Sequence, residues 1–293
     1  MTLEDLIYNR LANSVQLTSK LSRFGASPAI FYLKAPDDLS DGWQSRQQTP
    51  RIDYGLDRQA NPERHSSGTL TLNIWCSETE IPPEEIEPEI KSVLCNIFMQ
   101  PDAEQMPYCL VWSRSDTFET PRTTSNDYIN GITMQFDMLA FPNQLTTDPD
   151  PIQAINNYVK AVIPVAKIIG IDMLPTYYMP SVTEPAFYFR ILSLETARIT
   201  NSVAWLNVAI AGHIYAPTTA LRIRWMKNFV DDLALRGEIA MADGSPMLIS
   251  NIRADSAADQ LTTGQLRITA QYGILHKRPE AQKLMHPYTQ IGG

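Results

Sequence analysis

The strongest constraint on the fold is that the sequence repeats itself. Leu72-Asn73-Ile74 in the first half returns as Leu206-Asn207-Val208 in the second. The alternating run from Ile132 to Phe136 likewise returns as Ile268 to Tyr272, and in both copies a glutamine stands just before the aromatic residue. These matches predict a tandem duplication, and a duplicated module often occupies two places in a symmetric assembly.

Length and composition agree with two modules. The chain has 293 residues and a mass of 33.0 kDa, which suits two cores of about 140 residues each better than one large core. Hydrophobic residues make up 44% and charged residues 19%, and no apolar run approaches the roughly 20 residues of a membrane span. The net charge of −8 argues against a protein that holds nucleic acid, because such proteins displace counterions with clustered Lys and Arg.

The N-terminus and the cysteines indicate synthesis in a reducing compartment. Acidic Glu4 and Asp5 stand where an export signal carries positive charge, so we expect no such signal. Cys76, Cys95 and Cys109 are odd in number and lack the CxxC spacing. They are interpreted as small buried hydrophobic residues, not as a disulfide or metal framework.

Hydrophobic periodicity predicts the same order of elements in each half. In the first half we expect a helix near 3–11, strands near 29–32, 51–54 and 70–76, a helix near 83–98, and strands near 109–112 and 131–140. In the second half we expect a helix near 152–163, strands near 176–178, 187–189 and 204–210, a helix near 217–233, and strands near 247–252 and 266–274. The predicted fold class is α+β: two similar domains, each a small, mainly antiparallel sheet flanked by helices, in the order α-β-β-β-α-β-β.

Proline and short polar residues mark the boundary between the halves. The segment from Phe141 to Pro151 discourages both helix and sheet pairing. We therefore predict a first module at residues 1–143, a linker at 144–151, a second module at 152–276 and a C-terminal arm at 277–293.

The usual signatures of catalysis are missing. The sequence contains no phosphate-binding glycine motif, no GxSxG nucleophile elbow and no HExxH zinc pair. His65, His213, His276 and His286 are dispersed, and His213 is expected to hydrogen-bond a backbone group. We therefore predict no catalytic residue, no cofactor, no metal and no enzymatic activity.

Two helices carry opposite charge. Glu84, Glu85, Glu87 and Glu89 stand in the first turns of one predicted helix, where carboxylates oppose the positive end of the helix dipole. A cation site is the alternative. Arg222, Arg224 and Lys227 make one face of the other helix basic, which suits a solvated face, a salt bridge to the acidic helix of the neighbouring module, or a phosphate or partner contact.

Two further features are candidate interfaces. Arg114 with Asp116 and Arg253 with Asp255 each follow a predicted strand at matching places, so they form either ion pairs in turns or contacts between modules. In the tail, Leu284, Met285 and Tyr288 are natural contacts for another protein. Deletion of the residues after His276 is expected to reduce assembly while each domain still folds.

The order of elements, the helical start, the long polar loop between the strands at Arg51 and Leu70, and the proline-led helix after Trp75-Cys76 together resemble the tail terminator, or tail completion, proteins of long-tailed bacteriophages. The resemblance implies a structural virion protein of the tail and neck, assembled in the cytoplasm of the bacterial host. It implies a ring that caps the tail tube, contacts the tail tube protein and the head–tail connector protein, and lets DNA pass through its lumen without specific binding. Members of that family are typically single modules, so a tandem copy leaves open a trimer with pseudo-sixfold symmetry or a hexamer.

Two alternatives remain open at this point. Another head–tail connector or a tail tube subunit is favoured if the purified protein forms long polymers instead of closed rings. An enzyme of unknown type that uses Glu or Asp pairs requires a concave pocket in which carboxylates converge.

Overall fold

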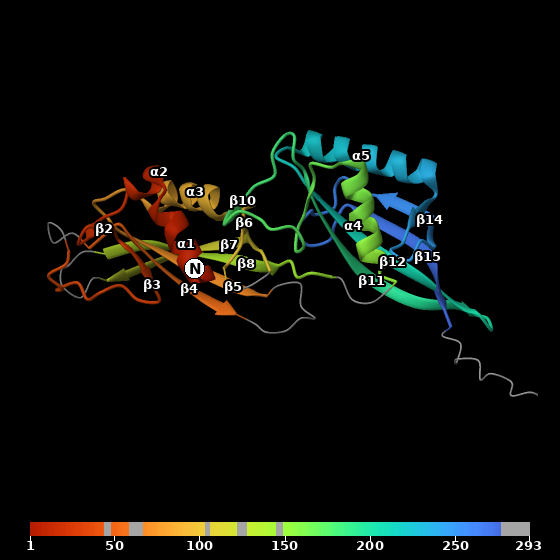
Figure 1. Ribbon diagram of the computed structural model, residues 1–293. Coiled ribbons are helices and arrows are strands. Elements are labelled where there is room, and N and C mark those ends of the chain that lie inside the picture. The colour runs from red at the N-terminus through yellow and green to blue at the C-terminus, as the bar shows by residue number, and fades with distance from the viewer. Residues whose placement is uncertain (44–47, 59–66, 103–105, 122–127, 145–148, 277–293) are drawn as a thin grey trace, which may run out of the picture.

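The computed structural model describes residues 1–43, 48–58, 67–102, 106–121, 128–144 and 149–276. Within these ranges helices and strands are mixed, and two larger sheets carry their helices on one side (Figure 1). The α+β class is therefore confirmed at this level of description.

The helices of the first half begin where the sequence supplies good starts. α1 (Leu3–Ala12) opens with a capping box, in which the Thr2 hydroxyl accepts the Asp5 N–H and the Asp5 carboxylate accepts the Thr2 N–H. The short α2 (Val15–Thr18) follows. α3 (Pro83–Leu94) has proline at its first position, where the missing N–H has no partner to lose.

The helices of the second half are capped in a similar way. α4 (Pro151–Val162) starts one residue before the predicted domain boundary, because the Asp150 carboxylate accepts the N–H groups of the first turn. α5 (Thr219–Arg236) is capped by Thr218 and ends at Gly237, whose φ of +69° closes the helix in the left-handed region.

The first sheet has seven strands in the order β10-β6-β7-β8-β5-β4-β3. The long strands pair antiparallel, and only the short β3 runs parallel to its neighbour β4. The strands are β3 (Ile30–Tyr32), β4 (Arg51–Arg58), β5 (Gly68–Ser77), β6 (Phe98–Met99), β7 (Tyr108–Pro121), β8 (Tyr128–Ala140) and β10 (Tyr177–Tyr178). A separate two-stranded sheet contains β1 (Arg23–Phe24) and β2 (Ser27–Pro28).

The second sheet has six strands in the order β13-β14-β15-β12-β11-β9. Here too the long strands are antiparallel, and the short β9 runs parallel to β11. The strands are β9 (Lys167–Ile168), β11 (Ala186–Ile199), β12 (Val203–Tyr215), β13 (Glu238–Ala240), β14 (Pro246–Ala254) and β15 (Leu266–Leu275).

Each sheet buries one face against its helices. In the first sheet, alternate residues of β5 and β8, from Leu70 to Cys76 and from Ile132 to Met138, pack on the apolar faces of α1 and α3. In the second sheet, alternate residues of β12 and β15 pack on α4 and on Phe229 and Leu233 of α5. The apolar residues that recur at every second position in the sequence are therefore the residues that the strands contribute to these two cores.

One predicted strand of the second half belongs to the first sheet. We expected residues 176–178 to be the first strand of the second module, and this is wrong: β10 pairs with β6 of the first sheet. The Tyr177 hydroxyl donates to the Leu6 carbonyl at 2.8 Å, and Tyr178 packs near Phe98. The edge strand of the second sheet is instead β9, which carries only two residues and gives no periodic signal.

The two sequence matches lie in different registers. Asn73 of β5 stands opposite Thr133, two residues before Gln135, whereas Asn207 of β12 stands opposite Gln271 itself. When β8 and β15 are aligned on their glutamines, Asn207 therefore corresponds to Thr71 and not to Asn73. The Leu-Asn match and the Gln-aromatic match cannot both join structurally equivalent residues.

All three cysteines are free thiols; Cys76 and Cys109 are buried, as expected, whereas Cys95 is only half-buried. Among the described residues, no helix has the length and hydropathy needed to cross a membrane.

Candidate functional site

A third apolar cluster joins the two halves of the chain. Phe98, Leu139 and Phe141 from the first half pack against Tyr188 and Tyr215 from the second, with ring centroids 5.0 Å apart for Phe98 and Tyr215 and 5.2 Å apart for Phe141 and Tyr188. The Tyr188 hydroxyl also donates to the Pro142 carbonyl at 3.1 Å. The halves are therefore held by a packed, mainly aromatic contact.

Sequence analysis missed this contact. Phe141 opens the segment 141–151, whose prolines and short polar residues predict a boundary between domains, and this composition gives no sign that the Phe141 side chain is buried. The available signal was the number of aromatic residues within or near the predicted strands of the second half, among them Tyr178, Tyr188 and Tyr215.

His213 lies inside β12, buried beside this cluster. Its Nδ1 lies 2.8 Å from the Gln260 carbonyl oxygen, and its Nε2 lies 3.2 Å from Nε of Arg190, which donates to it. The expected backbone hydrogen bond is confirmed, although the residue lies within the strand and not after it. Burial lowers the pKa of His213 to about 4, and the nearby Arg190 charge acts in the same direction.

The four charged residues predicted as paired interfaces do not occupy matching places. Arg114 and Asp116 lie within β7, where their side chains form an exposed ion pair of 3.3 Å and Arg114 Nε also donates to the Gln135 side chain at 2.9 Å. Arg253 lies near the end of β14, opposite Arg267. Asp255 follows that strand and accepts the Ala257 N–H in a turn.

The proposed equivalence of the two pairs is therefore wrong. β7 is longer than predicted and runs to Pro121, so the first pair lies in the middle of a strand while the second lies at a strand end. The third group of predicted interface residues, Leu284, Met285 and Tyr288, lies outside the described residues.

Two of the four carboxylates of the acidic helix are paired within its own half. The Glu87 carboxylate lies 2.6 Å from Nζ of Lys91 and accepts the Ser115 hydroxyl at 2.6 Å, and Glu89 pairs with Lys20 at 3.2 Å. Partial burial would raise the pKa of Glu87, but the hydrogen bonds from Lys91 and Ser115, with the charge of Lys91, lower it overall. These contacts favour the structural interpretation of the acidic cluster.

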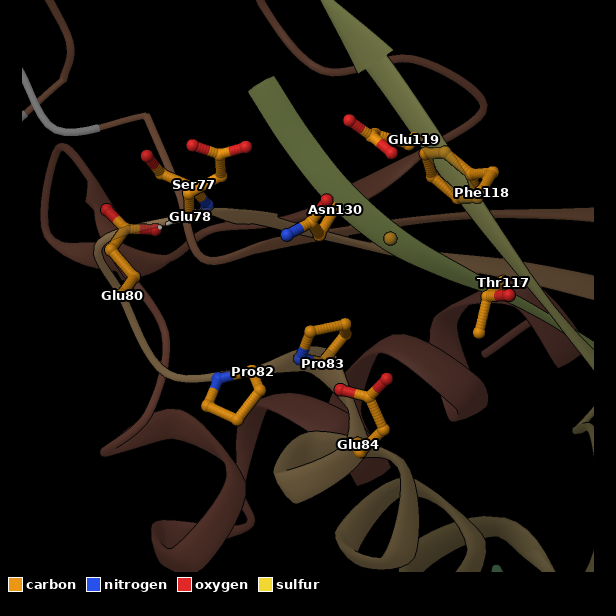
Figure 2. Close-up of a pocket in the computed structure, with 11 residues that line it drawn as sticks. Ser77, Glu78, Glu80, Pro82, Pro83, Glu84, Thr117, Phe118, Glu119 and Asn130 are labelled. Atoms are coloured by element: carbon orange, nitrogen blue, oxygen red, sulfur yellow. Dashed lines mark hydrogen bonds between the residues drawn. The ribbon is translucent and has the colours of Figure 1, made fainter. Parts of the chain in front are cut away.

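A cleft of about 510 Å³ opens beside the start of the same helix. It lies between the end of β5, the entry to α3 and the distal parts of β7 and β8, and Glu78, Glu80, Glu84 and Glu119 are among its lining residues (Figure 2). Figure 2 shows these four residues distributed around the cleft. Across the described ranges, no group of three or more His, Cys, Asp and Glu side chains is placed to hold a metal ion.

The basic helix pairs mainly with itself. Arg222 donates to the Thr219 hydroxyl at 3.0 Å, Lys227 pairs with Asp231, and the Arg224 guanidinium lies 5.6 Å from the Trp225 ring centroid. None of the ion pairs found among the described residues joins α5 to α3. The salt bridge to the acidic helix of the other half, one of the possibilities raised by the sequence, does not form within one chain.

The outer face of the first sheet carries a polar network. The Asp53 carboxylate accepts the Asn73 side chain and the Trp75 indole N–H, each at 2.7 Å, and the Thr133 hydroxyl donates to Asn73 at 2.8 Å. Burial raises the pKa of Asp53 although both hydrogen bonds act to lower it. This network fixes the side chains of three neighbouring strands on the face that no helix covers.

Comparison with known proteins gives no family assignment: no family model matches the chain, and no curated protein matches it.

Proposed function

We propose that the two halves are copies of one module and that the protein forms a ring at the end of a bacteriophage tail tube. In this proposal the ring halts growth of the tube, joins it to the head–tail connector, and lets DNA pass without binding it specifically.

The observation that carries the proposal is the agreement between the two strand orders. The order β6-β7-β8-β5-β4-β3 of the first sheet corresponds position by position to β13-β14-β15-β12-β11-β9 of the second. In both, a helix precedes the parallel edge strand, and a second helix follows the central strand β5 or β12. Agreement in order, direction and helix placement over six strands supports common ancestry more strongly than the short sequence matches do.

The arrangement of the halves supports a ring. They lie side by side with their helices on the same side of the sheets (Figure 1). The contact between them joins different surfaces of the two modules, since β6 and Phe141 of the first meet β10 and Tyr215 of the second. A contact between unlike surfaces can repeat from module to module, and it closes into a ring when the rotation per step divides a full turn.

The charge suits a lumen through which DNA slides. The net charge of −8 repels phosphates, whereas a lumen rich in Lys and Arg would retain them. The tail terminator resemblance, the absence of catalytic motifs and the acidic character therefore support the same role.

The test is the mass and shape of the purified protein. Native mass spectrometry should give a closed assembly of three chains, with six modules around the ring, or of six chains, and negative-stain images should show rings of one diameter. Long polymers would favour the tube or connector alternative. A chain that stays monomeric at tens of micromolar would contradict the proposal.

A further inference from the structure

The second half has a sheet edge that corresponds to the edge covered in the first half, but in one chain nothing described covers it. In the first sheet, β6 is paired on both sides, with β7 on one and β10 on the other. In the second sheet, the corresponding edge strand β13 pairs only with β14, and no described strand lies on its outer side. The second half therefore covers the β6 edge of the first sheet, whereas the corresponding β13 edge of the second sheet is open.

The apolar side chains beside these two edges show the same difference. Leu139 lies four residues after Gln135 in β8 and is 4% exposed, because the second half covers it. Leu275 lies four residues after Gln271 in β15, on the same face of its sheet, and is 72% exposed. Leu248, opposite Gln271 in β14, is an exposed apolar residue on this face as well.

The first half carries a segment that corresponds to the one that makes the internal contact. Residues 169–178, between β9 and β11, supply Ile169, Leu174 and β10 to the contact. Residues 33–43 occupy the same place in the first half, between β3 and β4. This segment has two strongly exposed apolar side chains, Leu33 at 68% and Leu39 at 86%.

The distribution of charge favours a second copy of the chain as the partner that covers the open β13 edge. Residues 1–143 contain 11 Lys and Arg against 20 Asp and Glu, a net charge of −9, whereas residues 144–293 contain 13 against 12, a net charge of +1. Contact between two first halves brings like charges together, while contact of a first half with a second half avoids that repulsion.

We propose that neighbouring chains repeat the internal contact: the segment 33–43 of one copy packs against Leu248, Leu275 and the outer edge of β13 of the next. We call the segment 33–43 the front and the surface around Leu248, Leu275 and β13 the back. The inference rests on the proposed ring, and it states which surfaces close it. A strand edge paired across chains gains backbone hydrogen bonds, and the exposed leucines leave water.

The test uses two double variants that block one side each. Leu33→Asp with Leu39→Asp blocks the front, and Leu248→Asp with Leu275→Asp blocks the back. Each variant alone should associate at least about 100-fold more weakly than the wild type, since every contact needs one front and one back. The matched control is Val15→Asp with Val165→Asp, which places the same charges on exposed apolar side chains that belong neither to the front, nor to the back, nor to residues 169–178, and it should assemble like the wild type.

Mixing the two blocked variants gives the decisive measurement. The intact front of the back-blocked chain can join the intact back of the front-blocked chain, so the mixture should form 1:1 heterodimers and nothing larger by native mass spectrometry. Circular dichroism confirms that each variant is folded. Assembly of either variant alone, or a mixture that stays monomeric while the wild type assembles, overturns this inference alone. A monomeric wild type overturns it together with the proposed ring.

Discussion

Replacement of Gly131 by alanine tests how tightly the outer face of the first sheet is packed. Gly131 lies in β8 between Trp75 of β5 and Phe118 of β7, and the Phe118 ring covers the space where a side chain would stand. A Cβ at this position would lie 2.1 Å from Phe118 Cζ and 2.6 Å from the Ile74 carbonyl oxygen. Such contacts are too short for either atom to remain in place.

The loss of stability in Gly131→Ala can be estimated from the groups that the new Cβ displaces. Phe118 packs edge-on against Trp75 with centroids 4.9 Å apart, so displacing the ring weakens a contact of about 0.5–1.5 kcal/mol. The Ile74 carbonyl belongs to the backbone of β5 and cannot rotate away. Gly131→Ala should therefore lower the free energy of unfolding by about 1–3 kcal/mol, the usual cost of overpacking.

Gly55→Ala is the matched control in the same sheet. A Cβ there would meet only Leu33 Cδ2, at 3.5 Å, which is an ordinary contact, so the change in stability should be about zero or a gain of up to about 1 kcal/mol. Urea denaturation followed by circular dichroism measures both variants. Adding Phe118→Ala to Gly131→Ala should recover part of the loss. Equal stabilities for Gly131→Ala and Gly55→Ala would refute the packing argument.

Three further predictions concern the buried groups. Phe98→Ala should lower the free energy of unfolding by about 3–5 kcal/mol, measured in urea, while Met173→Ala, at an exposed site, should change it by less than about 0.5 kcal/mol. Because burial lowers the pKa of His213 to about 4, the unfolded chain takes up a proton below pH 6.5 that the folded chain does not accept until about pH 4. Stability should fall by up to about 1.4 kcal/mol per pH unit across this window, and His213→Gln should flatten the dependence between pH 7 and pH 5. Burial raises the pKa of Cys76 and Cys109 to about 12, so a thiol reagent should modify both only after unfolding.

The alternating strands were predictable because each buries one face, and a period of two identifies such a strand directly. The run from Leu70 to Cys76 and the strand from Leu266 onward were found in this way. Helix starts were predictable for a similar reason, since Thr2 and Pro83 have side chains suited to the first turn. Both signals depend only on residues that are close together in the sequence.

The contacts that decide the arrangement of the halves are not local, and the sequence did not reveal them. β10 has only two residues; it pairs with the distant β6, and its Tyr177 hydroxyl donates to the carbonyl of Leu6, 171 positions away. The extent of β7 was also missed, because its distal half is exposed and polar and has no buried face to create a pattern. For that reason Arg114 and Asp116 appeared to follow a strand that in fact contains them.

The register of the two central strands shows why short repeats mislead even when the larger repeat has structural support. A Leu-Asn pair fits any strand position that alternates between an apolar face and a polar one, so Asn73 and Asn207 arise at positions two residues apart in the sheet. The order of six strands cannot arise from such local preferences, because it depends on which distant segments pair. If the halves do share an ancestor, the differences between them lie where their surroundings differ. Leu139 faces the partner module and is buried, whereas Leu275 faces outward and is exposed, which is the difference expected of a chain whose second partner is another copy of itself.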